Sequence, residues 1–179
     1  LLPDHFRCDP GKENMAMVLR KEIPLHIHAH RSDDICTAIR IAKEYDIRIV
    51  IVHCTDGIDI AEHIAASGFP CSKQEVWNKS FETAGVLNRA GVKVCITADH
   101  DVTPLYYLPI YAAMAVRFGM DDAEALRAVT SYPAEILGID DRKGALVSGK
   151  DADLVIWSHH PFDIHAKAEH VFIEGKQEC

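Results

Sequence analysis

An alternation of apolar residues and histidines near the start of the chain constrains its fold most. From Ile23 to Arg31 the sequence reads Ile-Pro-Leu-His-Ile-His-Ala-His-Arg, so His26, His28 and His30 recur at every second position. A β-strand places alternate side chains on one face, and this segment is therefore predicted to be a strand with its three imidazoles side by side. Because neutral imidazole is the commonest protein metal ligand, the alternation also raises the question of a metal site.

Strand and helix patterns then alternate along the first hundred residues. Residues 47–53 (Ile-Arg-Ile-Val-Ile-Val-His) are almost continuously apolar and rich in β-branched residues, which is typical of a parallel strand covered on both faces. Between the two strands, Asp33 or Asp34 is expected to cap a helix with apolar residues at helical spacing. The next predicted elements are a helix at about 59–66 that ends at Gly68, a helix at about 82–90 and a strand at 92–98.

This order of elements is typical of a parallel α/β sheet or barrel. After Asp99 the pattern predicts three helices, at about 105–118, 121–130 and 133–137. The tail differs, because residues 144–157 and 169–175 read as short strands separated by turns. We therefore expect an α/β part over residues 1–140 and a small β unit over residues 141–179.

Composition argues against two classes of partner. With 27 acidic against 19 basic residues and no basic stripe, the chain is not expected to bind nucleic acid. No apolar run approaches the roughly 18 residues of a membrane span, so no membrane contact is expected. The six cysteines lack paired spacing and are expected to be buried thiols in a reducing cytoplasm rather than disulfides or nucleophiles.

Three predicted strands end in residues that can bind a metal. His28 and His30 close the first strand, His53 closes the second, and Asp99 follows the third. In parallel α/β folds the carboxyl ends of the strands meet at one edge, where reactive residues collect. Imidazole and carboxylate are ligands that Zn²⁺ accepts, so the strand ends indicate a zinc site.

The same segments resemble the amidohydrolase superfamily, and most closely its imidazolonepropionase-related and dipeptidase-like members. The resemblance is carried by Pro24-Leu-His-Ile-His-Ala-His-Arg-Ser-Asp-Asp-Ile35, by Val52-His-Cys-Thr55 and by Thr97-Ala-Asp-His100. Residues 121–138 are similar to the last barrel helices of that family, and residues 144–157 to its C-terminal strand segment. The likeness extends from about residue 23 to residue 175.

This resemblance implies a TIM-like (β/α)₈ barrel with a small β-sandwich, of which the chain would be the C-terminal half. It makes His28 the ligand on the fifth strand, His53 the ligand on the sixth and Asp99 the ligand on the eighth, while His26 and His30 fall outside the ligand pattern. A start at Leu1 rather than Met agrees with a missing first half. About a dozen residues that would carry a seventh strand are also expected to be missing, so Pro70 and Cys71 are predicted not to be natural neighbours.

By the same resemblance, the whole protein would be a hydrolase in which metal-activated water attacks a C–N bond of a cyclic amide, an amidine or a dipeptide-like small molecule. One or two divalent ions, zinc first, would be the cofactor. Asp99 would act as general base and then general acid. A deaminase of the same superfamily and a non-catalytic fragment with an incomplete metal site are the alternatives.

The neighbouring polar residues allow more than one interpretation. His30, Arg31 and His100 are candidates for contacts with substrate or with the ligands, and Arg31 could instead pair with Asp33 or Asp34. Four strands cannot close a barrel, so the exposed strand edges are expected to pair with another chain, as in a homo-oligomer, or with the missing half of the barrel.

Overall fold

A computed structural model describes residues 9–73, 80–100 and 102–178. Its strands are β1 (Leu25–Ala29), β2 (Ile49–His53), β3 (Cys71–Lys73), β4 (Val94–Ile96), β5 (Leu154–Trp157), β6 (Ala168–Ile173) and β7 (Lys176–Gln177). Its α-helices are α1 (Pro10–Leu19), α2 (Ser32–Glu44), α3 (Ala61–Ser67), α4 (Thr83–Arg89), α5 (Leu108–Arg117), α6 (Asp122–Ala128) and α7 (Ser131–Leu137). Two 3₁₀ helices, η1 (Thr55–Ile60) and η2 (Leu105–Tyr107), precede α3 and α5. Cys8 and Cys179, two of the six predicted thiols, lie outside the described residues.

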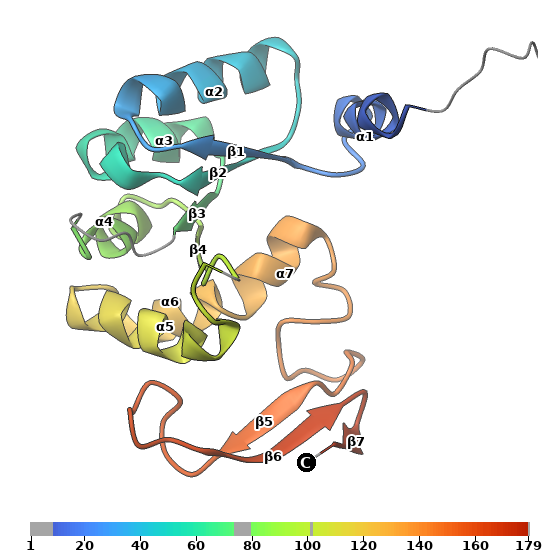
Figure 1. Ribbon diagram of the computed structural model, residues 1–179, viewed down its shortest axis with the longest axis vertical. Helices are drawn as coiled ribbons and strands as arrows, with labels where there is room; N and C mark the ends of the chain where they lie inside the picture. The colour runs from blue at the N-terminus through green and yellow to red at the C-terminus, as the bar shows by residue number, and fades with distance from the viewer. Residues whose placement is uncertain (1–8, 74–79, 101, 179) are drawn as a thin grey trace, which may run out of the picture.

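The fold is a mixed α/β arrangement with two separate sheets. β1, β2, β3 and β4 pair in that order, and every pair is parallel. Helices α2, α3 and α4 lie along one side of this sheet, and α5 and α6 lie below β4 (Figure 1). The predicted mixed fold with a parallel sheet and a β tail is therefore confirmed, and the described strands form an open sheet.

A strand lies where the sequence pattern suggested that one was absent. β3 pairs with β2 through Ile51 and Cys71 and with β4 through Cys71 and Val94. The N–H of Ile51 donates to the carbonyl of Pro70 at 3.0 Å, so Pro70 already belongs to the ladder. The expectation that the seventh strand is missing is therefore wrong, whereas the expectation that residues are missing between Pro70 and Cys71 stays a prediction. Three residues are too few to show the alternation by which strands are recognised.

The helix boundaries show which residues that were predicted to begin or end a helix do so. Asp121 caps α6, because its carboxylate accepts from the N–H groups of Ala123 and Glu124. Gly68 ends α3 in the left-handed conformation, as expected. The expectation that Asp33 or Asp34 caps α2 is wrong, because the helix starts at Ser32 and both residues lie inside its first turn.

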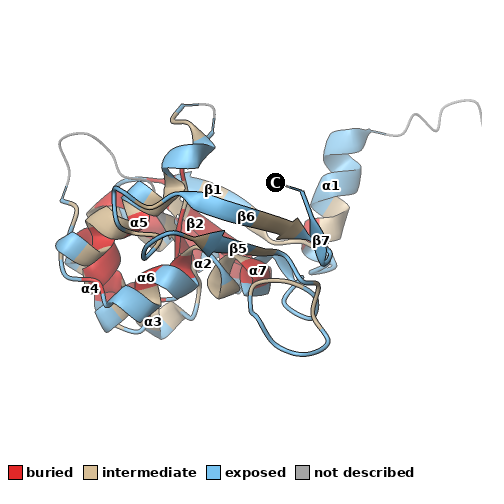
Figure 2. Ribbon diagram, turned by 90° about the horizontal axis from the view of Figure 1, so that it is seen from below, coloured by how far each residue is buried: buried red, intermediate tan, exposed pale blue. Residues whose placement is uncertain are grey.

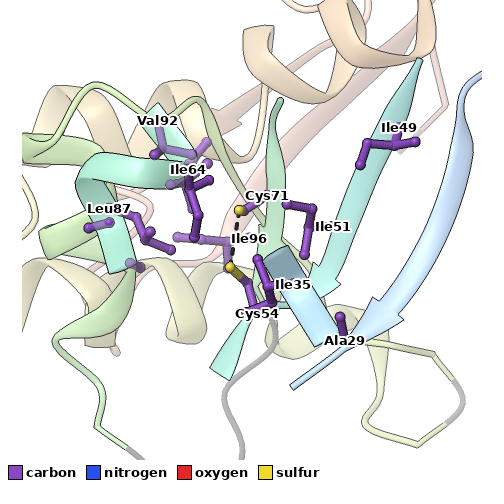
Figure 3. Close-up of a cluster of buried hydrophobic side chains, with 14 of the residues drawn as sticks. Ala29, Ile35, Ile49, Ile51, Cys54, Ile64, Cys71, Leu87, Val92 and Ile96 are labelled. Carbon is purple, nitrogen blue, oxygen red and sulfur yellow. Dashed lines mark hydrogen bonds between the residues drawn. The ribbon is translucent and has the colours of Figure 1, made fainter. Parts of the chain in front are cut away.

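The main core lies between the parallel sheet and helices α2, α3 and α4. The face of the sheet that these helices cover is called its outer face, and the opposite face its inner face. Figure 2 shows the buried residues gathered in this layer, while the small sheet is largely exposed. Figure 3 shows how the side chains interlock: Ile51 of β2, Ile35 of α2 and Ile64 of α3 meet around Cys54 and Cys71. Each of these five residues is fully buried, and burying one such aliphatic side chain contributes about 1.5–3 kcal/mol.

The tail forms a three-stranded antiparallel sheet in the order β5-β6-β7. The segment before it is held by ion pairs from Arg142 and Lys143 to Asp151, and from Lys143 to Asp153. Phe162, in the β5–β6 connection, packs against the main core. Among the described residues, no helix has the length and apolar character needed to cross a membrane.

The two faces of α2 allow a direct test of this packing. Ile35 is 0% exposed and Ile41 is 37% exposed on the same helix. We expect Ile35→Ala to lower the free energy of unfolding by about 2–5 kcal/mol through lost burial and a cavity, and Ile41→Ala to lower it by less than about 1 kcal/mol. Denaturant unfolding followed by circular dichroism measures both. Equal losses would contradict the described orientation of α2.

Candidate metal centre

The register between β1 and β2 brings two histidines together. Ala29 lies opposite His53, and His28 lies opposite Val52. Within β1, Leu25, Ile27 and Ala29 are half-buried or buried, whereas His26 and His28 are exposed on the other face. This alternation confirms that His26 and His28 share one face, which points away from the helix-covered core, whereas His30 lies beyond the end of β1.

His53 adopts a backbone conformation that directs its side chain out of the strand pattern. Its φ is +71° and that of Cys54 is +49°, both in the left-handed region that non-glycine residues seldom occupy. Two successive residues of this kind turn the chain sharply from β2 into η1. Backbone strain persists only where the surrounding structure enforces it, and such sites are often functional.

The two imidazoles approach each other through defined ring nitrogens. His53 Nε2 lies 3.1 Å from His28 Nδ1, and the rings meet edge to face with centroids 4.3 Å apart. His53 is only 7% exposed, so the pair has one buried member and one member open to solvent. One ring can donate to the other when it carries the proton at that nitrogen.

The remaining predicted histidines lie in different surroundings. His30 stacks on His53, and its Nδ1 lies 2.8 Å from Thr55 Oγ1. His100 is exposed in the turn after β4. His26 lines a cavity of about 290 Å³ on the inner face of the sheet, whose walls are otherwise mostly apolar. The contact between His30 and Thr55 was not predicted, although the hydroxyl two residues after the strand-end His53 is a signal for it.

Asp99 lies at the same edge of the sheet but on a strand that does not neighbour β2. It follows β4 in a turn with φ +50°, and its N–H donates to Thr97 Oγ1 at 3.2 Å. β3 separates β4 from β2. Within residues 9–73, 80–100 and 102–178, no three His, Cys, Asp or Glu side chains cluster closely enough to hold a metal ion. His28, His53 and Asp99 as a joint ligand set therefore stay a prediction.

Arg31 engages its own helix rather than the strand ends. Its guanidinium donates to both carboxylate oxygens of Asp33, at 3.0 and 3.1 Å. This hydrogen-bonded pair lowers the pKa of the Asp33 carboxyl. Of the two interpretations open for Arg31, the structure shows the pair with Asp33.

Three cysteines near the strands are core thiols. Cys54 and Cys71 lie with their sulfur atoms 3.2 Å apart, and both are fully buried (Figure 3). The hydrogen bond to Cys54 and burial raise the pKa of Cys71 well above its ordinary value. Burial raises the pKa of Cys95 to about 12. Thiols in such surroundings are poor nucleophiles, as expected from the sequence.

The spacing of the two nitrogens fits a shared zinc ion. Zn–N bonds of about 2.0–2.1 Å at a tetrahedral angle place two ligand nitrogens about 3.3 Å apart. The observed 3.1 Å between His28 Nδ1 and His53 Nε2 is close to this separation. The donor chemistry and the spacing of this pair therefore suit zinc, with further ligands required to complete a site.

Comparison with known proteins identifies the family. A model of the amidohydrolase family matches residues 15–177, so the chain belongs to that family. A solved amidohydrolase from Thermotoga maritima is 39% identical and superposes with a TM-score of 0.91 over 98% of this chain and 48% of its own. The imidazolonepropionase of Brucella suis is 30% identical over 162 residues, which is 86% of this chain and 38% of that enzyme.

A more distant structure shares the fold and has bound metal. An adenosine deaminase from Xanthomonas campestris, solved with bound zinc, is 24% identical with a TM-score of 0.65, over 95% of this chain and 48% of its own. The chain thus spans less than half the length of each of these three proteins. The comparisons support the resemblance recognised in the sequence and a hydrolase of this superfamily.

The described thiols should differ in reactivity. Cys36 is half-buried, whereas Cys54, Cys71 and Cys95 are buried. A pKa of about 12 leaves Cys95 with a thiolate fraction near pH 8 on the order of 10³-fold below that of an ordinary thiol. We therefore expect iodoacetamide to label Cys36 rapidly and the other three only after unfolding, as read by peptide mass spectrometry. Labelling of native Cys95 as fast as Cys36 would contradict its described burial.

Proposed function

We propose that this chain forms the carboxyl-terminal part of a metal-dependent amidohydrolase that cleaves a C–N bond. The hydrogen-bonded pair of His28 and His53 at the carboxyl ends of adjacent parallel strands carries this proposal. The family assignment supports a hydrolase, and the spacing of the two ring nitrogens suits zinc. The substrate class we propose is a small cyclic amide, amidine or dipeptide-like molecule.

Two imidazoles are too few ligands for a zinc site. Protein zinc sites use three or four protein ligands, and catalytic ones leave one position for water or substrate. We propose that Asp99 is a further ligand of the complete site and that the others come from the part of the family barrel that this chain does not span. The chain covers 48% of its Thermotoga maritima relative, which supports this division.

In this proposal each residue has a distinct role. His28 and His53 would hold the ion. Zinc bound there would supply an activated water and polarise the bond to be cleaved. Asp99 accepts the proton of the attacking water and delivers it to the leaving nitrogen. A carboxylate suits this task because it can return the same proton later in the reaction.

Two alternatives use the same residues. A deaminase of this superfamily would attack an amidine-like carbon, and the zinc-bound adenosine deaminase shares this fold. A non-catalytic fragment would bind metal weakly, and the absence of a three-ligand cluster among the described residues favours this outcome for the chain alone. Turnover tests on cyclic amides, dipeptides and aminopurines distinguish the first alternative, and zinc affinity distinguishes the second.

The proposed setting is a reducing cytoplasm, with assembly into a homo-oligomer. The described cysteines are all free, including the contacting Cys54 and Cys71, which agrees with reducing conditions. Among the described strands β1 has a neighbour on one side only, so its other edge can pair with a strand of a second copy or with the half of the barrel that this chain does not span.

Zinc affinity tests the histidine pair directly. We expect His53→Ala to lower the zinc affinity of the chain at least about 100-fold, because it removes a direct ligand. His26→Ala is the matched control, since His26 lies on the same face of β1 and has no contact with His53 among the interactions described. Competition titration with a chromogenic chelator measures both variants. Equal affinity in His53→Ala and the parent chain would refute the proposed site.

Asp99 is tested in the whole enzyme. We expect Asp99→Asn to lower kcat by about 10²- to 10⁴-fold, because the amide cannot accept a proton from water. Metal content by atomic emission and kcat on a dipeptide and on a cyclic amide are the measurements. Unchanged turnover with normal metal content would exclude Asp99 as the general base.

A further inference from the structure

His30 occupies a defined place beside His53 that the proposed metal site does not explain. Its ring lies nearly parallel to that of His53, with centroids 4.6 Å apart and an angle of 13° between the planes. On the other side, the His28 ring meets His53 at 89°. The His53 ring is therefore stacked against one histidine and met edge-on by the other.

Thr55 holds the stacked ring in place. Its Oγ1 lies 2.8 Å from His30 Nδ1, and the residue is only 4% exposed. A buried hydroxyl keeps its hydrogen-bond partner because water cannot replace it. The Thr55 hydroxyl thus anchors an otherwise exposed imidazole.

The backbone fixes Thr55 relative to β1. The left-handed turn at His53 and Cys54 reverses the chain so that the Cys54 N–H donates to the carbonyl of Ala29 at 3.0 Å. The N–H of Asp56 donates to the carbonyl of His30 at 2.8 Å. Both neighbours of Thr55 are therefore bonded to the last residues of the β1 segment, which places the hydroxyl beside Nδ1 of His30.

We propose that His30 and Thr55 are positioning residues that fix the orientation of the His53 ring. Rotation of the His53 ring away from His28 would break the stack with His30, so the stack holds Nε2 of His53 facing Nδ1 of His28. This inference rests on the proposed function for its purpose, which is to present a ligand nitrogen. It rests on the described contacts alone for the ring orientation.

Four variants separate the hydroxyl, the stacked ring and general packing. Thr55→Val removes the hydroxyl and keeps the branched shape, Thr55→Ser keeps the hydroxyl, and His30→Ala removes the ring. His26→Ala is the control on the same face of β1. Two readouts apply to the full chain: histidine ring ¹H–¹⁵N resonances without metal, and affinity for zinc alone by chelator competition.

We expect Thr55→Val and His30→Ala each to shift the His53 ring resonances and to lower zinc affinity about 10- to 100-fold, as outer partners of metal ligands typically do. The double variant Thr55→Val/His30→Ala should lose about as much zinc affinity as either single variant, because both changes act through the same series of contacts. Thr55→Ser should keep the zinc affinity within about 3-fold of the parent value and should keep the parent ring resonances. His26→Ala should change neither readout.

The two proposals fail in different ways. Unchanged His53 resonances in Thr55→Val and His30→Ala would overturn the positioning role, whether or not zinc binds. Failure of Thr55→Ser to restore the resonances would also overturn it, since packing alone would then explain the loss. If the parent chain binds no zinc while Thr55→Val and His30→Ala still shift the His53 ring resonances, the positioning role is supported and the proposal that the histidine pair holds zinc in this chain is overturned.

Discussion

The parallel register of β1 against β2 is the constraint on which the site depends. With Ala29 opposite His53, the ends of both strands lie at one edge, and the His28 ring reaches the His53 ring. A shift of one residue would move every side chain of β1 to the opposite face, burying histidines against α2 and exposing Ile27. Because Leu25, Ile27 and Ala29 are the apolar members of the strand, their packing against the helices fixes the register. The packing of the opposite face of β1 therefore sets the position of its histidines.

The sequence predicted those parts of the fold that rest on long, periodic patterns. The histidine face of β1, the apolar β2 and the helix between them follow from side-chain alternation and spacing, and the structure has all three. It did not predict β3, whose three residues are held by hydrogen bonds to β2 and β4 rather than by any pattern of their own. α1 was also missed, although Asp9 followed by Pro10 is a recognisable helix start.

For the candidate site, the sequence was informative about residue type and strand position but not about orientation. It selected His28 and His53, yet the contact between their rings depends on left-handed φ angles at both His53 and Cys54, which non-glycine residues seldom adopt. This turn also needs a glycine nearby, because a Cβ at Gly57 would lie 2.5 Å from the Cys54 sulfur. Tertiary packing thus determines the direction of the His53 side chain.

The separation of Asp99 from the histidine pair follows from the position of β3. Two strand spacings, about 10 Å, lie between β2 and β4 in the sheet. The ends of two strands that are not neighbours approach each other only when the sheet curves toward closure, as in a barrel. The exposed face of His26 and His28 is the one that such curvature would enclose. A ligand set drawn from β1, β2 and β4 therefore requires the curvature of a closed barrel, whereas the contact between His28 and His53 requires only the pairing of two adjacent strands.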